Sequence, residues 1–331
     1  MRGWSRLAAR SGEPPERGFD VIVERCLGTP VTALRELPAP ASTSYALRRL
    51  LLDLADGRTL DVLLKDFDVS PHAADLAMGR GARERYVYET VLAGRELGTP
   101  ELYGVVWDKP SGRHWLLLEF VQGRTLRQSP IRDWIAAAGW LGRLHGAVAG
   151  WEAELARSGP LASYDDAYFR DTSERALQAV GLRSGSLHHR LAAAVDGYGA
   201  MIESFCASRP TLVHGSYRPK NILVDTRAAP VRICPIDWEL AAVGPPLHDL
   251  ACMANEVDRR PTIARFCEAY AKGADAFGLA VTGIDELLAE LDRLRLHRVL
   301  RSLARSAEWA YPDSAVIRLV AQAETIRRDL G

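Results

Sequence analysis

The chain has 331 residues, of which 47% are hydrophobic and 25% are charged. Its 42 basic and 42 acidic residues cancel, which excludes the basic surplus expected of a nucleic-acid-binding protein. The five cysteines are odd in number and include no CxxC pair, so we expect neither a disulfide framework nor a zinc site. No stretch has the length of a membrane span and no signal-peptide pattern is found, so we expect a cytoplasmic protein without a membrane partner.

The first part of the chain has the pattern of β-strands. Two runs rich in apolar residues, 45–54 and 59–67, flank Ala-Asp-Gly-Arg at residues 55–58. Because Asp-Gly is a strong turn signal between such runs, the sequence predicts a β-hairpin.

A helix and two further strands are expected next. Apolar spacing predicts a helix over residues 81–97. Strands are predicted over residues 102–106 and 114–121, with a turn at residues 109–112 between them.

After Gly123 the pattern becomes helical. Helices are predicted over three ranges with apolar residues at helical spacing, 131–155, 187–207 and 283–309. Short strands and loops are expected over residues 211–237. The sequence therefore predicts an α+β protein of two lobes, a small β-rich lobe over residues 1–122 and a larger, mainly helical lobe over residues 123–331.

The residues that indicate a function lie in the second half of the chain. HGSYRPKNILVD occupies residues 214–225, PIDWE residues 235–239 and GPPLHDL residues 244–250. These motifs resemble those of the aminoglycoside phosphotransferase and choline kinase family, whose usual pattern is HGDxxxxN, then IDWE, then GxPxxDLA. The resemblance extends to most of the chain, through LLLEFVQG at residues 116–123, LGRLH at residues 141–145 and the strand lysine Lys65.

The resemblance implies a two-lobed, protein-kinase-like fold that transfers a phosphoryl group from ATP or GTP to a hydroxyl of a small molecule. Such transfer needs the phosphates and Mg²⁺ held in line with the acceptor, and little covalent chemistry from the protein. By the family pattern, Asn221 and Asp237 bind the metal, since an amide oxygen and a carboxylate suit Mg²⁺. His214 and Asp249 match positions that hold the catalytic loop, so we expect structural roles for both.

The resemblance places the nucleotide-binding residues in the first lobe. Lys65 matches the lysine that binds the α- and β-phosphates, and Glu84 matches the helix glutamate that pairs with it, with Glu89 as second choice. Glu119 and Val121 match the segment that offers backbone groups to the adenine. Each residue alone is a weak signal, and their order and spacing make the pattern specific.

Two departures from the family pattern bear on activity. Ser216 stands where the family has its catalytic Asp, and a hydroxyl is a poor base near neutral pH, so a loss of ~10²–10⁴ in rate is typical. The loss is smaller if the transition state is loose, because the proton then leaves late. The expected glycine-rich phosphate loop, residues 38–44, has no glycine. Ser42 and Thr43 there offer hydroxyls to phosphate oxygens, but close backbone approach is harder without glycine.

Two interpretations of different class therefore remain. One is a small-molecule kinase that tolerates a missing base, and the other is a pseudokinase that binds a nucleotide or a small molecule without phosphotransfer. Lys65, Glu84, Asn221 and Asp237 favour nucleotide and metal binding under both. Ser216 favours the pseudokinase. We place the kinase first because its ATP and metal residues are retained.

The sequence does not identify the acceptor. Arg218 and Lys220 add positive charge within the first motif, where they could hold phosphate or an anionic substrate. Arg298, Arg301 and Arg305 recur at helical spacing, and we expect them to form a solvated face and not an anion site.

Overall fold

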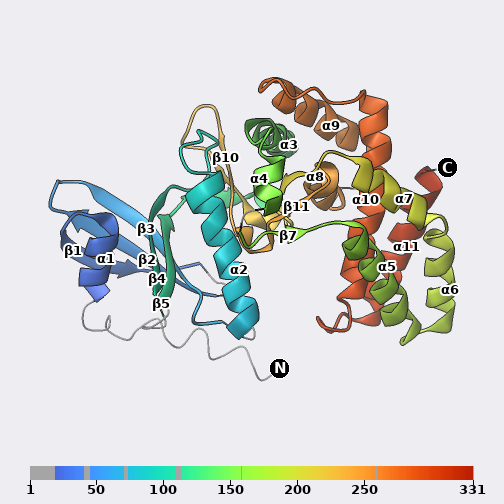
Figure 1. Cartoon of the computed structure of the whole chain (residues 1–331), viewed down its shortest axis with the longest axis horizontal. Helices are drawn as coiled ribbons and strands as arrows, with labels where there is room; N and C mark the ends of the chain where they lie inside the picture. The colour runs from blue at the N-terminus through green and yellow to red at the C-terminus, as the bar shows by residue number, and fades with distance from the viewer. Residues whose placement is uncertain are drawn as a thin grey trace. The chain divides into compact units, whose positions relative to one another are not determined.

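A computed structural model describes residues 19–40, 45–70, 74–108, 113–157, 159–257 and 259–330. The chain divides into two compact units, residues 1–123 and residues 124–331 (Figure 1). The first unit is built on a β-sheet and the second is mainly helical, so the predicted α+β class is confirmed.

The first unit contains a five-stranded antiparallel sheet in the order β1-β2-β3-β5-β4. Its elements are α1 (Phe19–Leu27), β1 (Val31–Leu37), β2 (Ala46–Leu54), β3 (Thr59–Asp66), α2 (Ala74–Tyr86), a π-helical turn η2 (Val87–Val91), β4 (Leu102–Asp108) and β5 (Arg113–Glu119). Strands β2 and β3 form the predicted hairpin, with Asp53 paired to Thr59. Gly57 in its turn has φ 86°, a conformation that glycine adopts without steric cost.

The two faces of this sheet have different neighbours. Val23 of α1 packs in one apolar core with Leu52, Val62 and Leu64 of β2 and β3. Because side chains alternate along a strand, Lys65 of β3 points to the opposite face from Leu64. That face receives the end of α2, as the contact of Lys65 with Glu84 shows.

The helix predicted over residues 81–97 was wrong at both ends. It begins earlier, at Ala74 in α2, and its last turn, η2, ends at Val91. The sequence did not predict the first turns of α2 because Gly81 lies among them and glycine has a low helix propensity. Here the glycine serves packing, since an added Cβ would lie 2.8 Å from the Phe67 ring. Gly94, with φ 69°, lies just beyond the helical end.

The second unit is mainly helical, with two small sheets in the orders β10-β9-β6 and β7-β11-β8. Its helices are α3 (Ile131–Ala147), α4 (Glu152–Arg157), α5 (Asp166–Gly181), α6 (Gly185–Ala194), α7 (Tyr198–Ala207), α8 (Leu247–Ala254), α9 (Arg260–Asp275), α10 (Ile284–Ala304) and α11 (Asp313–Asp329). Its strands are β6 (Arg124–Thr125), β7 (Ala162–Ser163), β8 (Thr211–Val213), β9 (Ile222–Asp225), β10 (Arg232–Pro235) and β11 (Ala242–Gly244). Short 3-10 turns are η3 (Leu126–Gln128), η4 (Pro219–Asn221) and η5 (Trp238–Leu240).

Glycines with positive φ interrupt two of the predicted helices. The helix expected over residues 131–155 is α3 followed by α4, with Gly150 at φ 89° between them. The helix expected over residues 187–207 is α6 followed by α7, with Gly197 at φ 73° between them. The third, expected over residues 283–309, is the single helix α10, which ends at Ala304.

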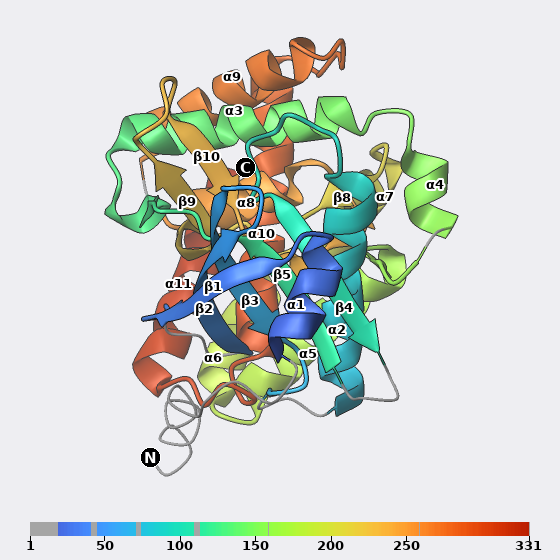
Figure 2. The same cartoon turned by 90° about the vertical axis from the view of Figure 1, so that its left-hand side faces the viewer.

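Two packing arrangements position the rest of this unit. Helices α3 (green) and α9 (orange) run side by side at the top of Figure 2. Their backbones approach closely, because a Cβ added at Gly142 of α3 would lie 2.0 Å from the Tyr270 carbonyl oxygen of α9. Helix α10 packs against α5, α8, α9 and α11, and is therefore largely buried.

Candidate active site

A buried ion pair occupies the first unit. Lys65 Nζ donates to Glu84 Oε2 over 2.6 Å, and the two side chains are 8% and 1% exposed. The expected pairing of Lys65 with Glu84 is therefore confirmed. Glu89, the second choice, pairs instead with Arg85 on the surface and is 41% exposed. Removing both charges from water costs free energy that their mutual attraction need not repay. The pair is therefore weak evidence for stability, and a functional role explains its burial better.

Two other residues predicted to bind the nucleotide, Glu119 and Val121, lie at the end of β5 and just after it. Glu119 ends β5, where its N–H donates to the Glu101 carbonyl and its side chain accepts from the Glu101 N–H. The Val121 carbonyl accepts from the Gly123 N–H two residues later. Ser42 and Thr43 lie outside the described residues.

In the second unit, a buried carboxylate fixes the loop after β8. Asp249 of α8 accepts from the His214 N–H over 2.5 Å and from the Gly215 N–H over 3.0 Å. Burial alone raises the pKa of Asp249, but the neighbouring His248 ring and the hydrogen bond from the His214 N–H outweigh it and hold the pKa below its usual value. The carboxylate is thus charged and anchors the loop, as the resemblance implied.

Gly215 is required by the path of this loop. Its φ is 74°, and a Cβ there would lie 2.0 Å from the Leu240 carbonyl oxygen and 2.7 Å from the Tyr164 hydroxyl. A larger residue would therefore meet both backbone strain and a clash. The tight turn presents Ser216 directly after it.

Ser216 and Asn221 lie in direct contact. The Asn221 side-chain amide donates to the Ser216 carbonyl over 3.0 Å and to Ser216 Oγ over 3.3 Å. Asn221 is buried, and it ends the 3-10 turn η4 just before β9. With its amide nitrogen directed at Ser216, the side-chain oxygen is the atom of Asn221 suited to bind a cation.

Asp237 lies in the neighbouring loop, which hydrogen bonds tie to the loop of Ser216. The Ile236 N–H donates to the Asn221 carbonyl over 2.9 Å, and His214 Nε2 lies 2.9 Å from the Ile236 carbonyl oxygen. Asp237 itself has φ 70° and ψ 61°, a left-handed conformation that is uncommon for a residue other than glycine. The structure therefore brings Ser216, Asn221 and Asp237 into one hydrogen-bonded region.

Arginines of α10 reach the same region, which the sequence did not predict. Arg301 Nη1 donates to the Gly215 carbonyl over 2.7 Å, and Arg298 Nη2 donates to Cys252 Sγ over 3.0 Å. The expected solvated face was therefore wrong for these two residues. The helical spacing of these arginines was predicted correctly. Both faces of α10 are covered, however, and Arg298 and Arg301 face α8 and the loop of Ser216. Arg305, one turn further on, keeps a surface ion pair with Glu308.

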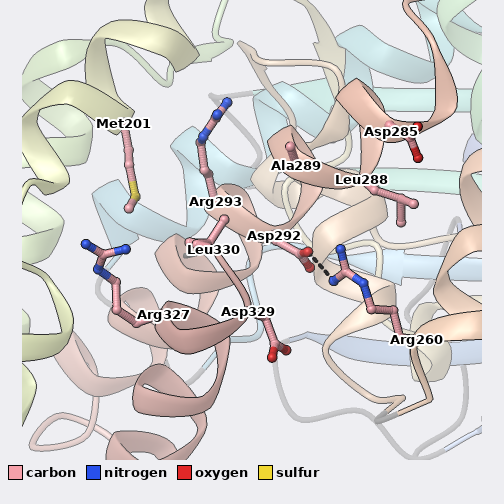
Figure 3. A pocket seen from close by; sticks show the side chains of 10 residues that line it. All are labelled: Met201, Arg260, Asp285, Leu288, Ala289, Asp292, Arg293, Arg327, Asp329 and Leu330. Atoms are coloured by element: carbon pink, nitrogen blue, oxygen red, sulfur yellow. Dashed lines mark hydrogen bonds and ion pairs between the residues drawn. The ribbon is translucent and has the colours of Figure 1, made fainter.

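The structure also contains a cavity away from this loop. It has a volume of about 300 Å³ and is lined by three arginines and three aspartates, together with four other residues (Figure 3). Two of these charges, Arg260 and Asp292, pair with each other. Asp292 lies nine residues before Arg301 on α10, or roughly 13 Å along the helix axis at 1.5 Å per residue. The cavity is thus separate from the region of Ser216.

Comparison with known proteins identifies the family. The model of the phosphotransferase enzyme family matches residues 44–283. The chain belongs to this family. No curated protein matches it. The matched range includes Lys65, Glu84, Ser216, Asn221 and Asp237, and the predicted family resemblance is confirmed.

Solved structures share the fold at low sequence identity. An aminoglycoside phosphotransferase in complex with GDP and kanamycin has a TM-score of 0.64 at 15% identity, covering 92% of this chain and 97% of its own. Choline kinase from Cryptosporidium parvum has a TM-score of 0.62 at 10% identity, covering 94% and 95%. A microcompartment-associated aminopropanol kinase has a TM-score of 0.56 at 17% identity, covering 89% and 90%. The kinase-like fold is therefore confirmed.

Two kinds of feature are absent from the described residues. None of the helices in the described ranges is long and apolar enough to cross a membrane. Within the same ranges, no cluster of three or more His, Cys, Asp or Glu side chains could hold a metal ion.

Proposed function

We propose that this member of the phosphotransferase family transfers the γ-phosphoryl group of ATP or GTP to a hydroxyl of a small molecule, with Mg²⁺. The observation that carries the proposal is the hydrogen-bonded region of Ser216, Asn221 and Asp237. The GDP present in one solved structure of the same fold supports a nucleotide as donor. The names of others, an aminopropanol kinase and a choline kinase, support a small hydroxylated acceptor.

The donor atoms of this region fit Mg²⁺. Asn221 offers an amide oxygen and Asp237 a carboxylate, and Mg²⁺ is usually bound by one or two such groups plus phosphates and water. Fewer than three protein ligands are therefore enough. When bound, the metal neutralises charge that develops on the transferred phosphoryl group.

Lys65 and Glu84 act on the phosphates in this proposal. The Lys65 ammonium binds the α- and β-phosphate oxygens, and Glu84 holds it in place through their 2.6 Å contact. Glu119 and Val121 offer backbone groups to the base, and Ser42 and Thr43 offer hydroxyls to the phosphates. Phosphoryl transfer then needs little further covalent chemistry from the protein.

Ser216 positions the acceptor hydroxyl and does not act as a strong base. The bond from phosphorus to the bridging oxygen breaks, a bond from phosphorus to the acceptor oxygen forms, and the acceptor proton leaves late, to water or to the phosphate. One observation favours a second candidate, the pseudokinase: Ser216 Oγ is held by Asn221 and no carboxylate occupies the family's base position.

The test is ATP consumption by wild type, Ser216→Asp and Ser216→Ala with a panel of hydroxylated acceptors. The proposal expects low turnover in wild type and a gain of ~10²-fold or more in Ser216→Asp, the usual worth of a general base. Brisk wild-type turnover that Ser216→Ala leaves unchanged would reduce Ser216 to a loop residue. A Ser216→Asp variant that binds Mg·ATP yet stays inert with every acceptor would favour the pseudokinase.

A further inference from the structure

Three guanidinium groups gather around the loop of Ser216. Arg301 donates a hydrogen bond to the Gly215 carbonyl and Arg298 donates one to Cys252 Sγ. Arg218 lies two residues after Ser216 in the chain. All three lie within electrostatic reach of the buried Cys252 thiol. Arginine stays charged at any accessible pH, so the cluster carries three fixed positive charges.

Two carboxylates near this cluster have other partners. Asp249 is fully buried and directs its two oxygens at the His214 and Gly215 N–H groups. Glu256 is shared, since it lies 3.6 Å from Arg218 and 3.3 Å from Arg127. Among the described residues neither carboxylate forms an ion pair with Arg298 or Arg301, whose side-chain hydrogen bonds go to Cys252 Sγ and to the Gly215 carbonyl.

Arg298 is the member of the cluster with an unused donor. Its Nη2 donates to a sulfur atom, which is a weak acceptor, while its Nη1 is buried without a hydrogen-bond partner among the described residues. Leaving a charged donor unsatisfied inside a protein is costly, and such cases in native structures call for a ligand or another explanation. An oxyanion is the partner that a guanidinium fork binds best.

We propose that the acceptor is an anionic small molecule whose carboxylate or phosphate is bound by Arg298, with Arg218 beside it, while its hydroxyl lies at Ser216. This substrate class rests on the proposed phosphotransferase function, whereas the oxyanion site itself does not. Arg301 has a positioning role, because it holds the Gly215 carbonyl and thereby the turn that precedes Ser216. A polycationic acceptor would be repelled by the same three charges.

The first experiment measures binding without a nucleotide. Titration calorimetry compares D-glycerate with glycerol, which lacks its carboxylate, and uses inorganic phosphate and glycerol 3-phosphate to distinguish the two anionic groups. Wild type should bind at least one of the anions and ignore glycerol. Arg298→Gln should weaken that binding ~10-fold or more, and Arg298→Lys should restore part of it. Arg175→Gln, which removes an equal charge from the surface of α5, should change nothing.

Several results would overturn the site. Anion binding that survives Arg298→Gln but is lost in Lys65→Ala would assign the anion to the nucleotide phosphates. Equal affinities for glycerol and D-glycerate would show that the carboxylate contributes nothing to binding. Failure of every anion to bind would show that no oxyanion site exists. If Arg298→Gln fails to fold, the melting temperature of wild type decides instead: phosphate or D-glycerate must raise it above the value in chloride of equal ionic strength.

Phosphotransfer assays then separate this inference from the proposed function. Turnover with D-glycerate or glycerol 3-phosphate, and not with glycerol or an aminoglycoside, supports both. If oxyanion binding depends on Arg298 but the protein binds no nucleotide, the proposed function is refuted and the oxyanion site is supported. Turnover confined to neutral or cationic acceptors would keep the function and refute the anionic substrate.

Discussion

The buried pair of Lys65 and Glu84 has a measurable energetic consequence at the scale of single residues. Lys65→Met leaves the Glu84 carboxylate buried without its lysine, which should cost about 3–5 kcal/mol of unfolding free energy. The double variant Lys65→Met with Glu84→Leu should regain most of that loss, since no lone charge is then buried. Urea unfolding of the three proteins measures both effects.

The control for this experiment is Arg58→Gln, which breaks the solvent-exposed ion pair with Asp56 and should leave the free energy of unfolding nearly unchanged. If the double variant is as unstable as Lys65→Met, the loss comes from packing and the argument about the buried charge fails.

Buried histidines predict a loss of stability in acid. Burial lowers the pKa of His145 and of His248 to about 4 each, whereas an unfolded histidine titrates near 6.5. Because the unfolded state binds protons more readily, protonation of these two histidines favours unfolding. Their contribution to the free energy of unfolding is complete above about pH 6.5 and falls as pH drops toward 4. By pH 5 each should have lost about 2 kcal/mol.

Urea unfolding at pH 7.5 and pH 5 measures this loss in wild type, in His145→Gln and in His188→Gln, whose histidine is exposed. His145→Gln should reduce the difference between the two pH values by about 2 kcal/mol, and His188→Gln should leave it unchanged. A pH dependence that is equal in all three proteins would contradict the assignment to buried histidines.

Several site residues could be predicted from the sequence because their signals are local or carry a known spacing. Lys65 with Glu84, and Asp249 with the loop of His214, follow the family pattern and lie where it implied. Arg298 and Arg301 could not be placed, because their orientation depends on which faces of α10 are covered. That depends on α5 and α8, which are distant in sequence.

At the scale of elements, the close packing of α3 on α9 depends on glycine. Gly142→Ala would place a methyl group 2.0 Å from the Tyr270 carbonyl oxygen, and backbone atoms cannot move aside as a flexible side chain does. We expect a loss of about 1–3 kcal/mol or more in urea unfolding, the usual cost of overpacking.

The matched control is Gly199→Ala in α7, where an added Cβ meets nothing within 4 Å. This change should raise stability by up to about 1 kcal/mol, because alanine is the better helix former. Equal effects at the two glycines would show that α3 and α9 separate easily and that their close approach is not required.

Elements were predicted best where a turn signal and an apolar pattern agree. The hairpin β2–β3 has both, whereas α3 with α4 and α6 with α7 each read as one helix. The apolar spacing continues across Gly150 and Gly197, so only their positive φ values reveal the breaks. A single glycine inside a helical pattern is tolerated often enough that sequence alone does not decide.

At the scale of the whole molecule, the proposed function requires residues of both units to act on one nucleotide. Lys65 lies in the first unit, and Asn221 and Asp237 lie in the second. The proposed function therefore implies that single substitutions in either unit weaken the same binding event.

The most direct test of the central claim is a calorimetric titration of Mg·ATP, and in parallel Mg·GTP, into wild type and Asp237→Ala, with and without Mg²⁺. Lys65→Ala, from the other unit, and Asp171→Ala, which removes an exposed carboxylate of α5, complete the set. We predict metal-dependent binding of one nucleotide by wild type, its abolition in Asp237→Ala, a strong loss in Lys65→Ala and no change in Asp171→Ala. No binding of either nucleotide by wild type, or equal affinities in wild type, Asp237→Ala and Lys65→Ala, would contradict the account.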